Sequence, residues 1–128
     1  MQRFQDIKAW QRSHQLTLDI YRLSSVLPDS ERYGLISQIR RAAASVPTNI
    51  AEGSKRRTAQ EYARFLNVAE ASLAELEYLL LLSRDLGYVT KPAVEKPLRE
   101  TGEIARMLNA LRSRVARLPH PNHSWAPG

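Results

Sequence analysis

Apolar residues recur at intervals of three and four along most of this chain, which is the spacing of one face of an α-helix. The pattern predicts four helices, over about residues 7–26, 30–53, 58–86 and 97–118, and there is little sign of strands. The connections between these segments are short, so consecutive helices should run antiparallel. We therefore expect an all-α fold, an up-down-up-down four-helix bundle that occupies residues 1–118.

The first predicted helix carries two apolar ridges. One contains Ile7, Trp10, His14, Leu18 and Tyr21, and a neighbouring one contains Leu16, Ile20, Leu23 and Leu27. We expect His14, which lies among apolar positions, to be a hydrogen-bonded core residue rather than a metal ligand. Pro28 should end this helix, because proline lacks an amide proton and disfavours helical geometry at the residue before it.

The second predicted helix contains Pro47. A proline there removes one backbone hydrogen bond and either kinks the helix or splits it into two pieces. We favour a kink, because the apolar stripe stays in phase across the proline. That stripe consists of Leu35, Ile39, Ala42, Ala43, Val46 and Ile50. Gly53 is expected to form a left-handed cap at the end of the helix.

The third and fourth helices differ in how clearly they begin. Thr58 and Glu61 match a capping box with the threonine as N-cap, and Gly87 suits the end of the third helix. Pro92 and Pro97 leave the start of the fourth helix open. Residues 119–128 contain three prolines and show no periodicity, so we expect a flexible tail outside the domain.

The third predicted helix is apolar on two sides. Its core face holds Tyr62, Phe65, Ala69, Leu73, Leu76 and Leu80, and a second stripe holds Ala71, Ala74, Tyr78 and Leu81. A helix that packs on one side only should be polar on the other, although scattered apolar side chains on a surface are also normal. We favour a subunit interface, because the two alanines allow another backbone to approach closely and Tyr78 and Leu81 supply apolar area.

The composition describes a basic chain of single-domain size. It has 128 residues, 43% of them hydrophobic, and a formal net charge of +6. This charge favours an acidic partner, most plausibly nucleic acid, although it also serves simple solubility. The chain has no cysteine, which excludes disulfides and cysteine nucleophiles. The sequence shows neither a signal peptide nor a membrane-spanning segment, so we expect a cytoplasmic protein without a membrane partner.

The chain contains no recognisable catalytic or metal-binding constellation. A di-metal bundle needs Glu-x-x-His pairs, and none of His14, His120 and His123 has a glutamate three positions before it. Catalytic triads and glycine-rich phosphate loops are absent from the sequence. Asn49 and Glu52 are interpreted as polar groups that tie helix ends together, with a small functional pair as the alternative. We expect no enzyme activity, no cofactor and no metal.

Positive charge gathers along the second helix and the loop after it. The candidate phosphate-binding residues are Arg40, Arg41, Lys55, Arg56, Arg57 and Arg64. Such residues can neutralise phosphates and make binding salt-dependent. The alternative is that they are simply solvated or paired with nearby acids. For Arg99, Arg106 and Arg117 on the fourth helix we prefer that alternative.

Several blocks of the chain resemble one known family. The blocks are Trp10, Ile20-Tyr21, Tyr33-Gly34-Leu35, QIRRAAASVPTNIAEG at 38–53, Arg64-Phe65-Leu66, AEASLAEL at 69–76, Gly87-Tyr88 and Met107-Leu108. In this order they are similar to proteins encoded in intervening sequences of bacterial 23S rRNA genes, and to the related accessory protein of diversity-generating retroelements. The resemblance covers about residues 4–118 and implies a bundle that assembles into a ring, commonly a homopentamer. It also implies a positively charged surface, a role with nucleic acid or a reverse transcriptase, and no enzyme activity.

Two functional hypotheses remain at this point. The first is a non-catalytic, oligomeric protein that binds RNA or DNA through the basic residues. The second is a scaffold for a polypeptide partner such as a retroelement reverse transcriptase. An enzyme is the hypothesis we favour least, because no acid, base, nucleophile or metal site converges in the sequence.

Overall fold

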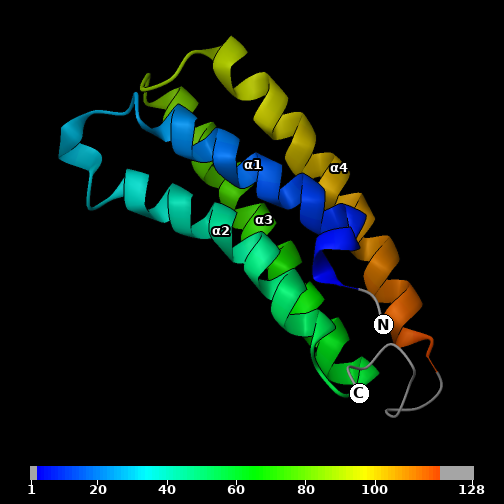
Figure 1. Cartoon of the computed structure of the whole chain (residues 1–128). Coiled ribbons are helices and arrows are strands. Elements are labelled where there is room, and N and C mark those ends of the chain that lie inside the picture. Colours follow the sequence, from blue (N-terminus) through cyan, green and yellow to red (C-terminus); the bar gives the residue numbers. More distant parts are fainter. Residues whose placement is uncertain (1–2, 119–128) are drawn as a thin grey trace.

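The computed structural model describes residues 3–118 and contains four long helices with no strand in that range (Figure 1). The helices are α1 (Lys8–Ser24), α2 (Leu35–Ser54), α3 (Ala59–Asp85) and α4 (Lys91–Ala116). Two short 3-10 turns, η1 (Phe4–Asp6) and η2 (Asp29–Glu31), lie before α1 and α2. The all-α prediction is confirmed. The predicted tail lies outside the described residues.

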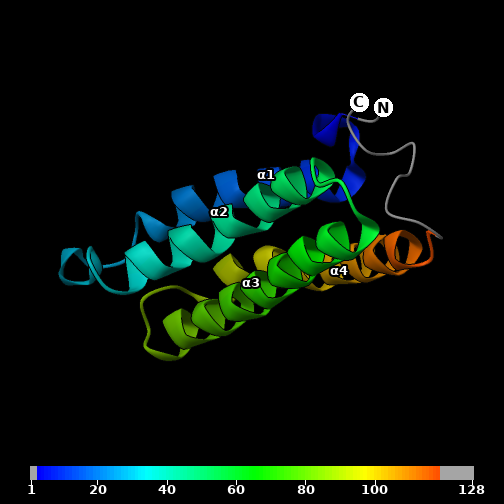
Figure 2. The same ribbon diagram turned by 90° about the horizontal axis from the view of Figure 1, so that it is seen from below.

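The helices form an antiparallel bundle in which sequence neighbours pack against one another. The contact between α2 and α3 is the most extensive, and α1 also touches α4, which closes the bundle. Viewed from below, α1 and α2 form one layer and α3 and α4 form the other (Figure 2). The core between the layers contains side chains with no exposed surface, such as Ile20, Ile50, Leu66, Ile104 and Leu108.

Pro47 lies inside α2 without splitting it, since the helix runs unbroken from Leu35 to Ser54. The proline lacks the amide that would bond to the carbonyl of Ala43, four residues earlier. The hydroxyl of Thr17 on α1 lies 3.1 Å from that carbonyl oxygen and donates to it, while sharing its proton with the carbonyl of Ser13 at 2.8 Å. A neighbouring helix therefore supplies the hydrogen bond that the proline removes.

Gly53 does not cap α2, so that prediction is wrong. The glycine lies within the helix, and the one positive φ among the described residues belongs to Gly87, at 79°. A Cβ at Gly53 would lie 2.8 Å from Cβ of Phe65 and 3.1 Å from Cδ1 of Tyr62. The glycine is required by the close approach of α2 to α3 rather than by a turn.

The structure corrects the predicted start of α2 and fixes the start of α4, which the sequence left open. α2 begins at Leu35 rather than near residue 30, because η2 and the non-helical Gly34 precede it. α4 begins six residues before Pro97, at Lys91, where the side chain of Thr90 accepts a hydrogen bond from the amide of Ala93. Pro97 is tolerated inside α4 because the carbonyl it leaves without an intrahelical partner belongs to Ala93, an exposed residue of the first turn.

His14 is exposed rather than buried in the core, which corrects the prediction for this residue. Its ring stacks on that of Trp10, with centroids 4.9 Å apart and planes inclined by 11°. The core side of α1 instead includes two buried serines, Ser13 and Ser24, whose hydroxyls donate to carbonyls of the preceding turn. Serines are usually found at the surface, so the sequence pattern did not assign Ser13 and Ser24 to the core. The predicted apolar face of α1 was therefore rotated about the helix axis relative to the face that is buried.

Candidate functional site

The antiparallel order places four chain segments at one end of the bundle. α1 and α3 begin there, and α2 and α4 end there (Figure 1). We call this the basic end, and it carries Arg3, Lys8, Lys55, Arg56, Arg57, Arg64, Arg114 and Arg117. The acids on the same end segments of the chain are Asp6, Glu52 and Glu61. Four separate stretches of sequence thus contribute to one positively charged surface.

The basic end accounts for most of the charge of the protein. Its eight cations exceed its three acids by five, while the whole chain has a net charge of +6. We leave Arg12 and Arg112 out of this count because they are paired. Arg12 lies 2.7 Å from a carboxylate oxygen of Glu100 and 2.6 Å from one of Glu103, and Arg112 lies 2.6 Å from Glu70.

The structure divides the predicted phosphate-binding residues into two groups. Lys55, Arg56, Arg57 and Arg64 lie at the basic end. Arg40 and Arg41 lie on α2, and they precede its C-cap residue Lys55 by 15 and 14 residues, which is about 20 Å along the helix axis. The six residues therefore do not form one cluster.

Arg40 is held in the contact between α1 and α2. Its Nε donates to the hydroxyl of Ser24 at 2.8 Å, and one terminal nitrogen donates to the carbonyl of Tyr21 at 3.3 Å. Its guanidinium carbon lies 4.8 Å from the centroid of the Tyr21 ring. These contacts indicate a structural role in joining the two helices.

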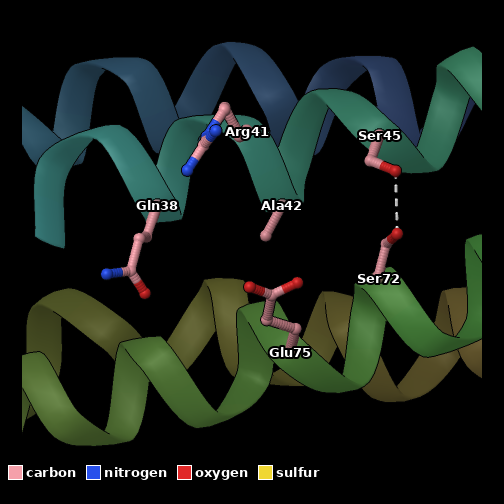
Figure 3. Close-up of a pocket in the computed structure, with 6 residues that line it drawn as sticks. All are labelled: Gln38, Arg41, Ala42, Ser45, Ser72 and Glu75. Carbon is pink, nitrogen blue, oxygen red and sulfur yellow. Dashed lines mark hydrogen bonds between the residues drawn. The ribbon is translucent and has the colours of Figure 1, made fainter. Parts of the chain in front are cut away.

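Arg41 is exposed and lines a polar groove of about 280 Å³ between α2 and α3. Figure 3 shows the carboxylate of Glu75 pointing towards α2 in this groove, beside Ala42. Farther along, the hydroxyls of Ser45 and Ser72 are hydrogen-bonded at 2.8 Å. A carboxylate in the same groove offsets the positive potential of Arg41, so this groove is less suited to phosphate than the basic end.

Asn49 also belongs to this polar region. Its amide donates to the carbonyl of Ser45 at 2.8 Å and to the hydroxyl at 3.0 Å. This agrees with the interpretation of Asn49 as a polar group with local structural contacts. Glu52, its predicted companion, is exposed and makes no ion pair among the described residues.

Two cations of the basic end are supported by aromatic rings. The guanidinium carbon of Arg56 lies 4.6 Å from the centroid of Phe65, and Nζ of Lys55 lies 5.9 Å from that of Phe4. Cation–π contacts position a charge without neutralising it. Within residues 3–118, neither these two residues nor Arg57 and Arg64 form an ion pair, so their charges remain available to an anion.

The sequence reasoning missed half of the basic end. Arg3, Lys8 and Arg114 were not singled out, and Arg117 was interpreted as ordinary surface charge. Each stands far from the 55–57 run in sequence, and only the antiparallel topology brings them to the same end. Counting charges at the helix termini of the predicted bundle would have found them.

Arg114 also acts on a neighbouring core residue. Burial raises the pKa of Tyr62 above its ordinary value, and the positive charge of Arg114 opposes that change. Tyr62 lies in the first turn of α3 and Arg114 in the last turn of α4, and both of these turns are at the basic end.

The described residues offer no centre for metal or membrane chemistry. No three histidine, aspartate or glutamate side chains in residues 3–118 come together as metal ligands. No helix in that range is both long and apolar enough to cross a bilayer. His120 and His123 lie outside the described residues.

The second stripe of α3 remains uncovered within one copy of the chain. Ala71 and Ala74 are exposed, Leu81 is half-buried, and Tyr78 has 61% of its surface exposed. By contrast, Tyr62, Ala69, Leu73, Leu76 and Leu80 on the opposite side are buried. The expected division into an inner and an outer apolar face is therefore present, while the interface itself stays a prediction.

Comparison with known proteins identifies a family and a similar solved structure. The family model described as 23S rRNA-intervening sequence protein matches residues 5–110. A crystal structure of a protein of unknown function from the S23 ribosomal protein family of Bacteroides thetaiotaomicron VPI-5482 is 24% identical in sequence. The similarity covers 81% of this chain and 97% of that one, with a TM-score of 0.76, and at this identity it shows the fold alone. No curated protein matches the chain.

Proposed function

The chain belongs to the family of 23S rRNA-intervening sequence proteins, and from this membership and its charge distribution we propose that it is a non-catalytic, oligomeric, nucleic-acid-binding protein. Its ligand is a structured RNA or DNA, and it contacts the phosphate backbone. The observation that carries the proposal is the basic end, where an excess of five positive charges gathers from four chain segments.

The chemistry of the basic end favours the backbone over the bases. Exposed arginines and lysines bind phosphate oxygens, and such contacts position a nucleic acid without reading its sequence. The aromatic rings there, Phe4 and Phe65, lie under Lys55 and Arg56 and are partly buried. Rings that are already covered by these cations expose little surface on which bases could stack. Proteins that bind single strands without sequence preference commonly use such base stacking.

Self-association strengthens such a surface. A single copy presents few phosphate contacts, whereas an oligomer presents several basic ends to one long ligand. The outer stripe of α3, with Ala71, Ala74, Tyr78 and Leu81, supports this part of the proposal. A ring, with a pentamer as the first expectation, is the assembly we propose.

A salt titration tests the phosphate contacts. We expect an RNA hairpin, followed by fluorescence anisotropy, to bind with a log K that falls linearly with log salt. If four cations each neutralise one phosphate, the slope is about −3.5 and the affinity falls roughly 100-fold between 50 and 200 mM salt. A flat response, or no binding at low salt, would rule out the proposal.

Matched charge reversals locate the surface. The double variant Arg56→Glu, Arg57→Glu and the control Lys91→Glu, Lys96→Glu change the net charge equally but at opposite ends of the bundle. The control should fold well, since glutamate is favourable in the first turns of α4. We expect the first variant to lose at least about tenfold more affinity than the control, and a smaller salt slope. Equal losses would show that net charge, not the basic end, controls binding.

A polypeptide-binding scaffold is the second candidate, and a different surface favours it. At the end of the bundle opposite the basic end, Val26, Tyr33 and Leu86 are 64%, 89% and 52% exposed. Large apolar side chains at a surface often mark protein contacts. A reverse transcriptase is the partner to test, by co-purification with wild type, Tyr33→Ser and Arg56→Glu/Arg57→Glu. Loss of the partner with Tyr33→Ser alone would favour the scaffold over direct nucleic-acid binding.

A further inference from the structure

A depression between α1 and α2 opens beside the basic end. Its volume is about 410 Å³, which lies within the roughly 300–1,000 Å³ that is usual for small-ligand sites. We call it the α1/α2 groove. Its α2 side presents the small or compact residues Ala44, Pro47 and Ala51. Since α1 and α2 form one layer of the bundle, the groove opens on the outer side of that layer (Figure 2).

The α1 side of the groove is aromatic. The rings of Trp10 and His14 are stacked with centroids 4.9 Å apart, and the ring of Phe4 meets Trp10 edge-on at 5.2 Å. Trp10 is half-buried and His14 is exposed, and no cation lies over either ring within residues 3–118. Unpaired bases of nucleic acids stack on side chains of this kind. The groove therefore has the aromatic surface that the rest of the basic end lacks.

Glu52 supplies a carboxylate at the edge of the groove. Thr17 and Thr48 also line the groove, but the hydroxyl of each donates to a backbone carbonyl 2.8 Å away. Glu52 is exposed and makes no ion pair among residues 3–118. A carboxylate repels phosphate, so Glu52 is unsuited to a backbone contact. As an acceptor of hydrogen bonds it suits a ligand group that carries N–H donors.

Guanine is the base whose donors match a carboxylate. Its Watson–Crick edge presents two adjacent donors, N1–H and the N2 amino group, and one carboxylate can accept from both. Adenine and cytosine each present one amino donor beside an acceptor nitrogen, and uracil presents one N–H between two carbonyl oxygens. A carboxylate only accepts, so each of these three bases would bring an acceptor against it. Unpaired bases are recognised by hydrogen bonds on this edge.

The cations next to the groove lie where the strand of such a nucleotide would continue. Lys55 follows Glu52 by three residues, which is about 4.5 Å along the axis of α2. Its Nζ lies 5.9 Å from the centroid of the Phe4 ring, which lines the groove. Arg56 and Arg57 follow directly in the chain. A nucleotide with its base in the groove can therefore place its own phosphate at Lys55 and neighbouring phosphates at the two arginines.

We infer that the α1/α2 groove binds an unpaired guanine base of the nucleic acid whose phosphates contact the basic end. The inference rests on the proposed function and adds one base contact to a surface that otherwise contacts the backbone. The aromatic side of the groove stacks on the base, and Glu52 accepts hydrogen bonds from N1–H and the N2 amino group. The ligand then has a loop or bulge rather than an unbroken duplex, because pairing occupies the Watson–Crick edge of a guanine.

Three RNA hairpins that differ at a single bulged position test the groove. The position carries guanosine, adenosine or an abasic site, and fluorescence anisotropy measures the affinity. We expect the guanosine hairpin to bind about tenfold more tightly than the abasic one, with adenosine between them. The salt slopes should be equal, because the phosphate contacts are shared. Guanosine monophosphate should compete only weakly, since it lacks the neighbouring phosphates, and competition as strong as that of the hairpin would overturn the assignment to a strand.

Matched substitutions separate the base contact from the effect of charge. Glu52→Gln and Glu61→Gln each remove one negative charge from the basic end, but Glu61 belongs to α3 and does not line the groove. Both variants should bind the abasic hairpin more tightly than wild type does. Glu52→Gln should lose the preference for guanosine over adenosine, and Glu61→Gln should keep it.

Trp10 reports directly on the occupancy of the groove. The chain has two tryptophans, so a Trp125→Phe background isolates the fluorescence of Trp10. We expect the guanosine hairpin to quench this fluorescence and the abasic hairpin to leave it nearly unchanged. His14→Ala, at an exposed position where the fold should tolerate the change, should weaken binding of the guanosine hairpin and leave binding of the abasic hairpin unaltered.

The outcomes distinguish failure of the groove from failure of the proposed function. Equal affinity for the guanosine and abasic hairpins, with the salt dependence intact, would overturn the base contact and leave the phosphate surface in place. An equal guanosine preference in Glu52→Gln and Glu61→Gln would exclude Glu52 as the contact. Trp10 fluorescence that changes with protein concentration but not with RNA would assign the groove to contact between copies and overturn the inference. No binding of any hairpin at low salt would remove the proposed function and this inference with it.

Discussion

Replacing Gly53 by alanine should destabilise the protein, although alanine is normally the better helix residue. In a helix interior alanine is favoured over glycine by roughly 1 kcal/mol. At this position the new Cβ would lie 2.8 Å from Cβ of Phe65, an atom fixed by the backbone of α3, whereas ordinary contacts begin at about 3.4 Å. α2 and α3 would have to separate by about 0.6 Å, and gaps of that size weaken the packing of every side chain between them.

The expected magnitude follows from these two opposing terms. Overpacking of this kind typically costs about 1–3 kcal/mol and the better helix propensity of alanine returns roughly 1 kcal/mol, so the net loss for Gly53→Ala should be up to about 2 kcal/mol. Gly102→Ala in α4 is the matched control, because its Cβ would meet nothing closer than a guanidinium nitrogen of Arg106 at 3.9 Å. That variant should gain about 0.5–1 kcal/mol.

Urea unfolding followed by circular dichroism measures both variants under the same conditions. In thermal unfolding of a domain of this size, a change of 1 kcal/mol in the free energy of unfolding corresponds to roughly 4 °C in Tm. The two substitutions should therefore move Tm in opposite directions by several degrees. If Gly53→Ala stabilises the protein as much as Gly102→Ala does, the result would contradict the close approach of α2 to α3 at Gly53.

Three further substitutions test contacts between helices. Thr17→Val should lower the free energy of unfolding in urea by about 1–2 kcal/mol, because it leaves the carbonyl of Ala43, which Pro47 cannot reach with an amide, without a donor. An unchanged free energy would show that water replaces the hydroxyl. Arg12→Ala should cost up to about 1 kcal/mol at low salt and less at 1 M salt, since it removes partly exposed ion pairs to two glutamates of α4. Tyr62→Phe should reduce the loss of stability in alkali. The pKa of this buried phenol is raised in the fold, so its contribution is present below about pH 10 and is lost as pH rises through the higher folded pKa. Unfolding curves between pH 8 and 11 that fall equally for both proteins would exclude this origin.

The helices were predictable because each is specified by local signals. The spacing of Leu35, Ile39, Val46 and Ile50 marks the buried side of α2, and the predicted N-cap of α3 forms as expected, with the side chain of Thr58 accepting from the amide of Glu61 at 3.1 Å. The errors have more than one cause. The role of Gly53 depends on a neighbouring helix, whereas Pro97 is tolerated because of the exposure of a residue in its own helix.

Pro97 and Gly53 illustrate this limit. A proline in a sequence marks a helix break unless something else satisfies or exposes the carbonyl four residues earlier, and only the three-dimensional structure shows which holds. A glycine after a periodic stretch suggests a cap, but the proximity of Phe65 gives it a packing role instead. Neither fact has a signature in the local sequence.

The candidate site was predictable only where its charges are consecutive. The run at 55–57 is visible in the sequence, and Arg40 and Arg41 were added to it because they share a helix. A shared helix does not place two residues together, since about 20 Å separates the ends of that stretch. The same topology brings Arg3 and Arg117, which are distant in sequence, to one end of the bundle.

The separation of charge from apolar surface has a consequence for the whole assembly. The basic end lies at the tip of the bundle, whereas the outer stripe of α3 lies on its side, so one copy can contact another through the stripe without covering most of its cations. In the proposed ring every copy has the same orientation relative to the ring axis, so all basic ends lie on the same side of the assembly. Two copies related by a two-fold axis across the helices would instead point their basic ends in opposite directions. A ring is therefore the arrangement in which a modest charge excess on each copy becomes one extended cationic face for a single nucleic-acid ligand.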